Sequence, residues 1–155
     1  MNKIFEKLTN QLTETIDSSV ALALHNKNQE VEVIHLLWAL LSNTNSVLNQ
    51  LLNKMNVNKV AVELEAKSYA SKLPSVSSVT KESIKLSRNL LSSLQSAEGL
   101  MASFGDKFIA VDTWLISNLD SSVIKDVLGK YVDLKEAKKE LEAMRAGNTI
   151  DSNSG

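Results

Sequence analysis

Apolar residues recur every four positions near the start of the chain. This spacing places them on one face of a helix and predicts a helix over about residues 5–25. The members of this stripe are Leu8, Leu12, Ile16, Val20 and Leu24. The strict alternation typical of strands is nearly absent, and the chain has only one proline and five glycines to interrupt helices. The pattern therefore favours a protein that is helical along most of its length.

A second long apolar stripe lies in the other half of the chain. Thr80 before it is a candidate N-cap, and Gly105 after it is a typical residue for a helix C-terminus. The members of the stripe are Ile84, Leu91, Leu94, Ala97, Met101 and Phe104. We expect a second helix here that corresponds to the first.

The correspondence extends to the segments that follow, which indicates an internal repeat. Residues 31–41 align with residues 109–119 at a spacing of 78 residues, and each segment is followed by a polar turn and a third apolar pattern. A fourth helix is predicted near residues 58–72 and near residues 134–145. The residues predicted to point inward from these last two helices are Val60, Ala61 and Leu64 in the first copy, and Leu134, Ala137, Leu141 and Met144 in the second.

The sequence thus predicts an all-α fold of eight helices, built from two four-helix repeats related by a pseudo-twofold axis. Each repeat alone would be marginal in size, so we expect one globular domain. The first repeat spans residues 1–73, a connector with the single proline spans 74–79, and the second repeat spans 80–146. Residues 147–155 are polar and without pattern, as in a flexible linker.

Composition excludes several classes of partner. The 17 basic and 18 acidic side chains give a net charge of −1, which argues against nucleic acid as a ligand. The apolar runs are far shorter than the roughly 18 residues that a membrane span needs, and no targeting segment is visible. The chain has no cysteine, which suits a reducing cytoplasm. We therefore expect a cytoplasmic protein that binds neither nucleic acid nor membrane.

Motifs for catalysis, cofactors and metals are also missing. There is no phosphate-binding glycine loop and no serine elbow, so neither ATP hydrolysis nor acyl transfer is supported in this chain. His25 and His35 lack metal-ligand spacing; we expect structural roles near helix ends for both. Trp38 is expected to be buried, whereas Trp114 could either pack in the core or line a groove. We predict no catalytic, cofactor-binding or metal-binding residues.

Five short motifs occur together in an order that resembles one known family, the double-repeat Clp N-terminal domains, in the version found in ClpB-type disaggregases. The resemblance covers the chain from Leu8 to about Gly147. The motifs are Lys-Leu-Thr-Asn at 7–10, His-Leu-Leu-Trp-Ala-Leu-Leu at 35–41, Lys-Leu-Pro at 72–74, Gly-Asp-Lys-Phe-Ile at 105–109 and Met-Arg-Ala-Gly at 144–147. None of them would be specific alone.

The resemblance implies a non-catalytic domain that binds unfolded or aggregated polypeptide and delivers it to a hexameric, ATP-driven threading ring. ATP and magnesium would then belong to ATPase modules that follow a linker at residues 147–155, and cooperation with an Hsp70 system would be expected. The resemblance also implies substrate-handling roles for Thr9, Asp106 and Asp112, the last replacing the glutamate usual in the family. The apolar residues closest in sequence to a family groove are Leu94, Phe108, Ile109 and Trp114.

Other interpretations of these residues stay open. Asp112 falls in the first turn of a predicted helix, where the unpaired N–H groups alone would favour a carboxylate. Thr9 falls inside a predicted helix, where its hydroxyl could bond the carbonyl four residues back. The domain could instead dock adaptor proteins, or the chain could be a small helical enzyme with a dispersed site.

Overall fold

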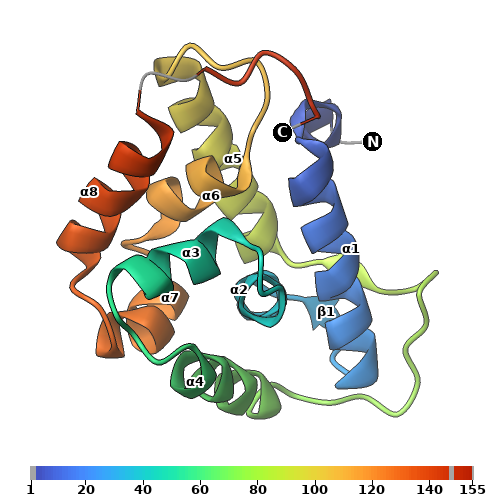
Figure 1. Cartoon of the computed structure of the whole chain (residues 1–155). Helices are drawn as coiled ribbons and strands as arrows, with labels where there is room; N and C mark the ends of the chain where they lie inside the picture. Colours follow the sequence, from blue (N-terminus) through green and yellow to red (C-terminus); the bar gives the residue numbers. More distant parts are fainter. Residues whose placement is uncertain (1–2, 147–148, 155) are drawn as a thin grey trace.

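The computed structural model describes residues 3–146 and 149–154, and within them it has eight α-helices, two short 3-10 helices and one two-stranded sheet (Figure 1). The elements of the first half are η1 (Lys3–Lys7), α1 (Asn10–His25), β1 (Glu30–Val31), α2 (Val33–Ser42), α3 (Val47–Lys54) and α4 (Lys59–Ser71). Those of the second half are β2 (Lys85–Leu86), α5 (Arg88–Ser103), α6 (Val111–Asn118), α7 (Ser122–Val127), η2 (Leu128–Lys130) and α8 (Leu134–Arg145). The predicted all-α fold with four helices in each repeat is confirmed.

The two long helices begin later than the apolar stripes predicted. The N-cap of α1 is Thr9 and that of α5 is Ser87; their hydroxyls accept the backbone N–H of Leu12 at 3.2 Å and of Leu90 at 3.1 Å. Thr80, the predicted cap, instead forms a hydrogen-bonded turn with Ser83. Both helices were predicted to begin too early because apolar residues pack against the core from the backbone before each cap. Leu8 is buried and forms a β-bridge, and Ile84 is partly buried just before the strand β2.

That extended backbone joins the two repeats crosswise. Leu86 in β2 pairs with Val31 in β1, and Leu8 forms an isolated parallel bridge with Ile109. In both cases, backbone just before the first helix of one repeat pairs with backbone just before the second helix of the other repeat. This exchange makes the two repeats one domain, since neither can be removed without breaking pairs of the other.

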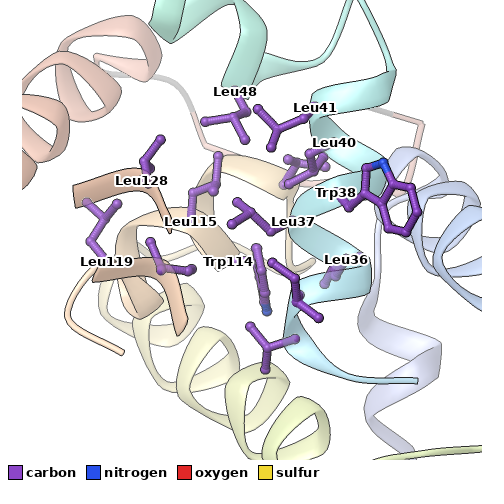
Figure 2. Packing of buried hydrophobic residues seen from close by; sticks show 14 of the residues in the cluster. Leu36, Leu37, Trp38, Leu40, Leu41, Leu48, Trp114, Leu115, Leu119 and Leu128 are labelled. Atoms are coloured by element: carbon purple, nitrogen blue, oxygen red, sulfur yellow. The ribbon is translucent and has the colours of Figure 1, made fainter. Parts of the chain in front are cut away.

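The core is centred on α2, of whose ten residues nine are buried. Figure 2 shows Trp114 of α6 packed among the leucines of α2, with Trp38 on the opposite side of α2 toward α1. The third apolar pattern of each copy contains Val47 or Val123 at its start, and both of these are only partly buried. Its other members are buried as predicted, and these are Leu48, Leu51, Leu52, Ile124, Val127 and Leu128. No helix in the described part of the chain is both long and apolar enough to cross a membrane.

The predicted inner face of the fourth helix was wrong in the first repeat. Val60 is 66% exposed and Leu64 60% exposed, whereas α4 packs against the core through Val62, Ala66 and Ala70. The register is set by the cap residue Asn58, which accepts the N–H groups of the first turn. In the second repeat, Ala137 and Leu141 are buried as predicted.

The segment after α8 packs against the domain. Gly147, Asn148 and Gly155 of the predicted linker lie outside the described residues, but residues 149–154 run from α8 to the N-terminal end of α1 (Figure 1). Backbone hydrogen bonds join Ile150 to Lys107 and Asn153 to Asn10. The division of the chain at residues 73 and 80 stays an interpretation of the sequence, because the cross-pairing mixes the two copies.

Candidate functional site

The loops that follow α1 and α5 have the same backbone conformation. Lys27 and Gly105, 78 positions apart, both have positive φ, of 57° and 75°. The next residues, Asn28 and Asp106, each donate the backbone N–H to a carbonyl near the end of the preceding helix, that of Ala23 and that of Met101. The fold thus places one buried polar side chain at the same point of each repeat.

In the first repeat this side chain belongs to a neutral network. The Nδ1 atom of His35 accepts the backbone N–H of Glu32 at 2.8 Å, so Nε2 carries the proton and donates it to Asn28 Oδ1 at 2.8 Å. The side-chain amide of Asn28 donates to the carbonyl of Pro74 in the connector at 3.2 Å. Burial lowers the pKa of His35 from 6.5 to about 4, which keeps the ring neutral.

In the second repeat the same position carries an ion pair. Arg145, near the end of α8, donates to both oxygens of Asp106 at 2.9 and 2.7 Å and lies over the ring of Phe104, 4.1 Å from its centroid. It also contacts the hydroxyl of Thr113 at 3.4 Å. The side chain of Asp106 is fully buried and that of Arg145 is 10% exposed, so this pair is desolvated. A third bond to Asp106 comes from the backbone N–H of Ile150 at 2.9 Å.

Most of the residues singled out from the sequence are buried. Thr9, Leu94, Ile109 and Trp114 are each 0% exposed. Thr9 is the cap of α1 rather than a residue inside a helix, and its backbone N–H bonds the carbonyl of Ile109 at 3.0 Å. Trp114 packs in the core and donates its indole N–H to Ser93 at 2.9 Å. These four side chains cannot meet a ligand without a rearrangement of the core.

Phe108 and Asp112 keep part of their surface exposed. Asp112 lies in the first turn of α6, where its Oδ1 accepts the N–H of Thr113 at 2.8 Å, as the capping interpretation predicts. The seven residues therefore do not form one open site. The structure brings Thr9 and Ile109 together at the crossed backbone, Asp106 to Arg145, and leaves Asp112 at the surface.

An open groove lies beside these residues, between the exposed face of α1 and the ends of α2 and α3. We call it the repeat-1 groove; it has a volume of about 220 Å³. An apolar hollow of about 320 Å³ shares Ser18, Ala39 and Asn43 with it and adds Ala21 and Leu22. The residues lining the groove are Gln11, Glu14, Thr15, Ser18, Ala39, Leu40, Asn43, Asn45, Ser46, Val47 and Val111.

A groove of about 240 Å³ occupies the equivalent place in the second repeat. We call it the repeat-2 groove; Asn89, Ser92, Ser93 and Ser96 line it, each 78 positions after a lining residue of α1. Val33 of the first repeat takes the place that Val111 takes in the first groove. The lining of the repeat-1 groove contains one charged residue, Glu14, whereas the lining of the repeat-2 groove contains none.

The buried polar groups of the two loops are held by other groups of the domain, whereas the grooves are open. Among residues 3–146 and 149–154, no three His, Asp or Glu side chains lie together as metal ligands. The buried acid Asp106 is held by Arg145, and His35 is locked between two hydrogen bonds. The open surfaces present hydroxyls, amides and small apolar side chains that suit hydrogen bonding and contact with a polypeptide.

Sequence reasoning missed the roles of Arg145 and Asn28 and both grooves. A signal for Asn28 was present, because the 78-residue repeat that aligned the second helices also aligns Asn28 with Asp106. No comparable signal existed for the role of Arg145, which reaches Asp106 from 39 positions further along the chain. The grooves arise where separate helices meet, so no local pattern marks them.

The chain is thus a duplicated helical domain with crossed repeats and paired surface grooves. The family model described as Clp repeat (R) N-terminal domain matches residues 7–131. The chain belongs to this family.

Chaperone protein ClpB from Wolinella succinogenes is 55% identical over 148 residues, which cover 96% of this chain and 17% of that protein. The chain thus spans about a sixth of the length of this relative. The crystal structure of the Hsp104 N-terminal domain from Candida albicans superposes with a TM-score of 0.85 at 21% identity, covering 96% and 97% of the two chains. A structure described as a complex of ClpV N-domain with VipB peptide has a TM-score of 0.70 at 18% identity, with coverage of 90% and 88%.

Proposed function

We propose that this domain binds unfolded or aggregated polypeptide for a ClpB-like, ATP-driven disaggregase and that the repeat-1 groove takes the bound segment. The observation that carries the proposal is the groove itself, which continues into an apolar hollow along α1 and α2. Unfolded chains expose apolar side chains that folded proteins hide, so such a surface distinguishes the two. The family membership and the ClpB relative support this choice among binding functions.

The lining also favours weak and unselective binding. Its polar rim comes from amides and hydroxyls, which can donate to or accept from any backbone, and its apolar floor comes from small residues such as Ala21 and Ala39. We expect micromolar or weaker affinity, that is, about 8 kcal/mol or less, for a contact of this size. Glu14 at the rim would favour segments in which an apolar residue lies next to a lysine or arginine.

The experiment is a titration of the domain with reduced, unfolded casein, followed by NMR shifts and by affinity. Ser18 is exposed and lines both the groove and the hollow, so Ser18→Glu introduces bulk and charge without touching the core. We expect this variant to weaken casein binding about tenfold, because an apolar segment would have to pack against a charge.

Ser96→Glu is the matched control, because Ser96 is the exposed equivalent of Ser18 in the repeat-2 groove. Its affinity should equal that of the wild type. If casein binds the wild type and Ser18→Glu equally well, the repeat-1 groove is not the site. If casein does not bind any of the three proteins, the proposed function is wrong.

The docking of a specific partner peptide is a second candidate. The ClpV N-domain of similar fold is described in complex with a peptide of one named protein, VipB. For the present domain, recognition of a defined sequence predicts that unrelated unfolded proteins do not compete with one another for binding. Competition between casein and a second unfolded protein of different sequence would favour the substrate-binding function instead.

The rest of the proposal concerns the protein of which this chain would be a part. ClpB relatives lead us to propose that ATPase modules using ATP and magnesium follow the domain, assemble as a homohexamer, and act in the cytoplasm with an Hsp70 system. Thr9, Asp106 and Asp112 would then contribute to substrate handling in two ways. Thr9 and Asp106 would act by holding the crossed backbone and the loop before α6 in place, and Asp112 would act at the surface, next to the groove residue Val111.

A further inference from the structure

The segment at residues 149–154 is held to the domain by its backbone. The carbonyl of Ile150 accepts the N–H of Lys107 at 2.8 Å, and the N–H of Ile150 donates to Asp106 Oδ1 at 2.9 Å. The carbonyl of Asn153 accepts the N–H of Asn10 at 2.7 Å. Because all three bonds use main-chain atoms of the segment, the surface beneath it recognises backbone groups rather than a particular sequence.

The groups on the domain side need partners of this kind. Asn10 lies in the first turn of α1, where backbone N–H groups have no acceptor within the helix. The N–H of Lys107 lies in the loop between α5 and α6, and the carboxylate of Asp106 is fully buried. We call Asn10, Asp106 and Lys107 the backbone-acceptor surface.

In the first repeat a different segment, the connector, is hydrogen-bonded to the corresponding loop, with donors and acceptors that differ from those of the second repeat. There, Val76 of the connector donates its N–H to the carbonyl of Lys27 at 2.8 Å, and Asn28 donates to the carbonyl of Pro74 at 3.2 Å. The connector runs between two packed elements, α4 and β2, which both fix it in place. Each repeat therefore holds a segment of the chain against the loop that follows its first helix.

The occupant in the second repeat is followed by no further helix or strand in the described part of the chain. Thr149 and residues 151–154 are exposed, and only Ile150 is partly buried. Three hydrogen bonds, each modest once exchange with water is counted, oppose the entropy lost by ordering six residues. The entropy cost is the larger of these two terms, so the segment is held weakly and a competing chain could displace it.

The surface lies beside the groove. Asn10, which bonds the segment, is followed directly by Gln11, which lines the repeat-1 groove. An unfolded chain that enters the groove along α1 would reach the backbone-acceptor surface at the end of that helix.

We propose that the backbone-acceptor surface is a second contact site for extended, unfolded polypeptide and that residues 149–154 occupy it as an internal competitor. A bound chain presents an N–H to Asp106 and carbonyls to Lys107 and Asn10 as it replaces the segment. The surface takes a short stretch with one aliphatic residue among polar ones, as Ile150 is placed in the internal occupant. This inference rests on the proposed function, because it requires that the domain bind unfolded chains.

The test is Ile150→Pro in the full chain, which removes the N–H that bonds Asp106 while keeping the rest of the segment. We expect the backbone of residues 149–154 to become mobile, seen as a fall in the heteronuclear NOE. If the segment is docked about nine-tenths of the time, affinity for reduced casein rises about tenfold at this surface when it is released. Casein should then shift the amide resonances of Lys107 and Asn10 in the variant.

The matched control is Ser152→Pro, whose backbone N–H takes no part in the three bonds named above. It should leave both the NOE and the affinity at wild-type values. A released segment with casein affinity unchanged or weakened would overturn the inference, and so would an Ile150→Pro variant whose segment stays ordered. Loss of casein binding in every form, the wild type included, would instead mean that the proposed function is wrong.

Discussion

The two repeats place different chemistry at the same point of the fold. In the first repeat, the buried loop residue is Asn28, which belongs to a neutral network with His35 and the connector. In the second repeat it is Asp106, which is paired with Arg145. The backbone around them is the same, down to the positive φ of the preceding residue and the carbonyl that accepts the loop N–H.

This difference shows that the fold requires a hydrogen-bonding side chain at the loop but does not require a particular charge. Either solution gives the buried polar atoms hydrogen-bond partners, and leaving such atoms unpaired would destabilise the fold. The two solutions differ in how they respond to mutation and to pH. The following predictions use that difference, from the largest effect to the smallest.

Removal of the arginine should have the largest effect. Arg145→Met leaves the carboxylate of Asp106 buried without its charged partner, and we expect a loss of about 4 kcal/mol in the free energy of unfolding. Urea denaturation followed by circular dichroism measures it. The double variant with Asp106→Asn has no buried charge and resembles the first repeat, so it should recover most of the loss. A double variant as unstable as Arg145→Met would show that the charge is not the cause.

Acidification should affect the first repeat through His35. Its pKa is lowered to about 4 in the fold from 6.5, so the folded state binds fewer protons than the unfolded state between these values. The stability held above pH 6.5 is therefore lost as the pH falls toward 4, by about 3 kcal/mol in total.

The measurement for His35 is urea denaturation at several pH values for the wild type and for His35→Gln. Other carboxylates titrate in both proteins, so the difference between the two curves isolates the imidazole. Stability of the variant should depend less on pH between 6.5 and 4. Parallel curves for the two proteins would contradict the assignment of His35 as a buried neutral base.

The positive-φ residues of the two equivalent loops, Lys27 and Gly105, should respond in opposite directions. Gly105→Ala forces a Cβ into the left-handed region and should cost about 1 kcal/mol, although no atom lies within 4 Å of that Cβ. Lys27→Gly relieves the corresponding strain in the first repeat but makes the unfolded chain more flexible, so we expect a gain of at most about 0.5 kcal/mol. Thermal unfolding of both variants checks the signs. Equal effects of the same sign would show that the two loops are not equivalent.

The smallest effect should come from the exposed apolar pair on α4. The caps Asn58 and Asp133 align α4 with α8 at a spacing of 75 residues. In this alignment Val60 and Leu64 are equivalent to Lys135 and Lys139, which are exposed.

Replacing Val60 and Leu64 by lysine should change the free energy of unfolding by less than about 0.5 kcal/mol. Val62→Lys, at a fully buried position of the same helix, is the control and should unfold the domain or nearly so. A large loss from the exposed pair would show that α4 packs differently from α8.

The sequence predicted much of this fold for two reasons. Helix periodicity depends only on neighbouring residues, and the repeat keeps one constant spacing along the chain. The spacing of 78 residues correctly related the second helices, and the apolar patterns located the third ones. The starts of α1 and α5 were predicted wrongly, since Leu8 and Ile84 belong to the apolar stripes although both lie before the helices. An apolar stripe indicates which residues are buried, and burial alone does not distinguish a helix from extended backbone.

The candidate site was predictable only in part. Sequence and resemblance pointed to Thr9, Asp106 and Asp112, but the environment of each depends on residues distant in the chain, such as Ile109 and Arg145. Trp114, Leu94 and Ile109 are apolar, as residues of a binding groove and residues of a core both are. Only the packing of the folded domain shows that their side chains are buried. Their use in binding stays a prediction.

The sequence by itself determined the helical class, the duplication and the absence of recognisable catalytic motifs, because these follow from composition and from short-range periodicity. The tertiary structure decided the exchange of backbone between repeats, the pairing of Asp106 with Arg145, and the grooves between helices. It also decided that residues 149–154 lie against the domain. The physical reason is that hydrogen bonds and charge pairs depend on distances in space, which a linear pattern does not specify.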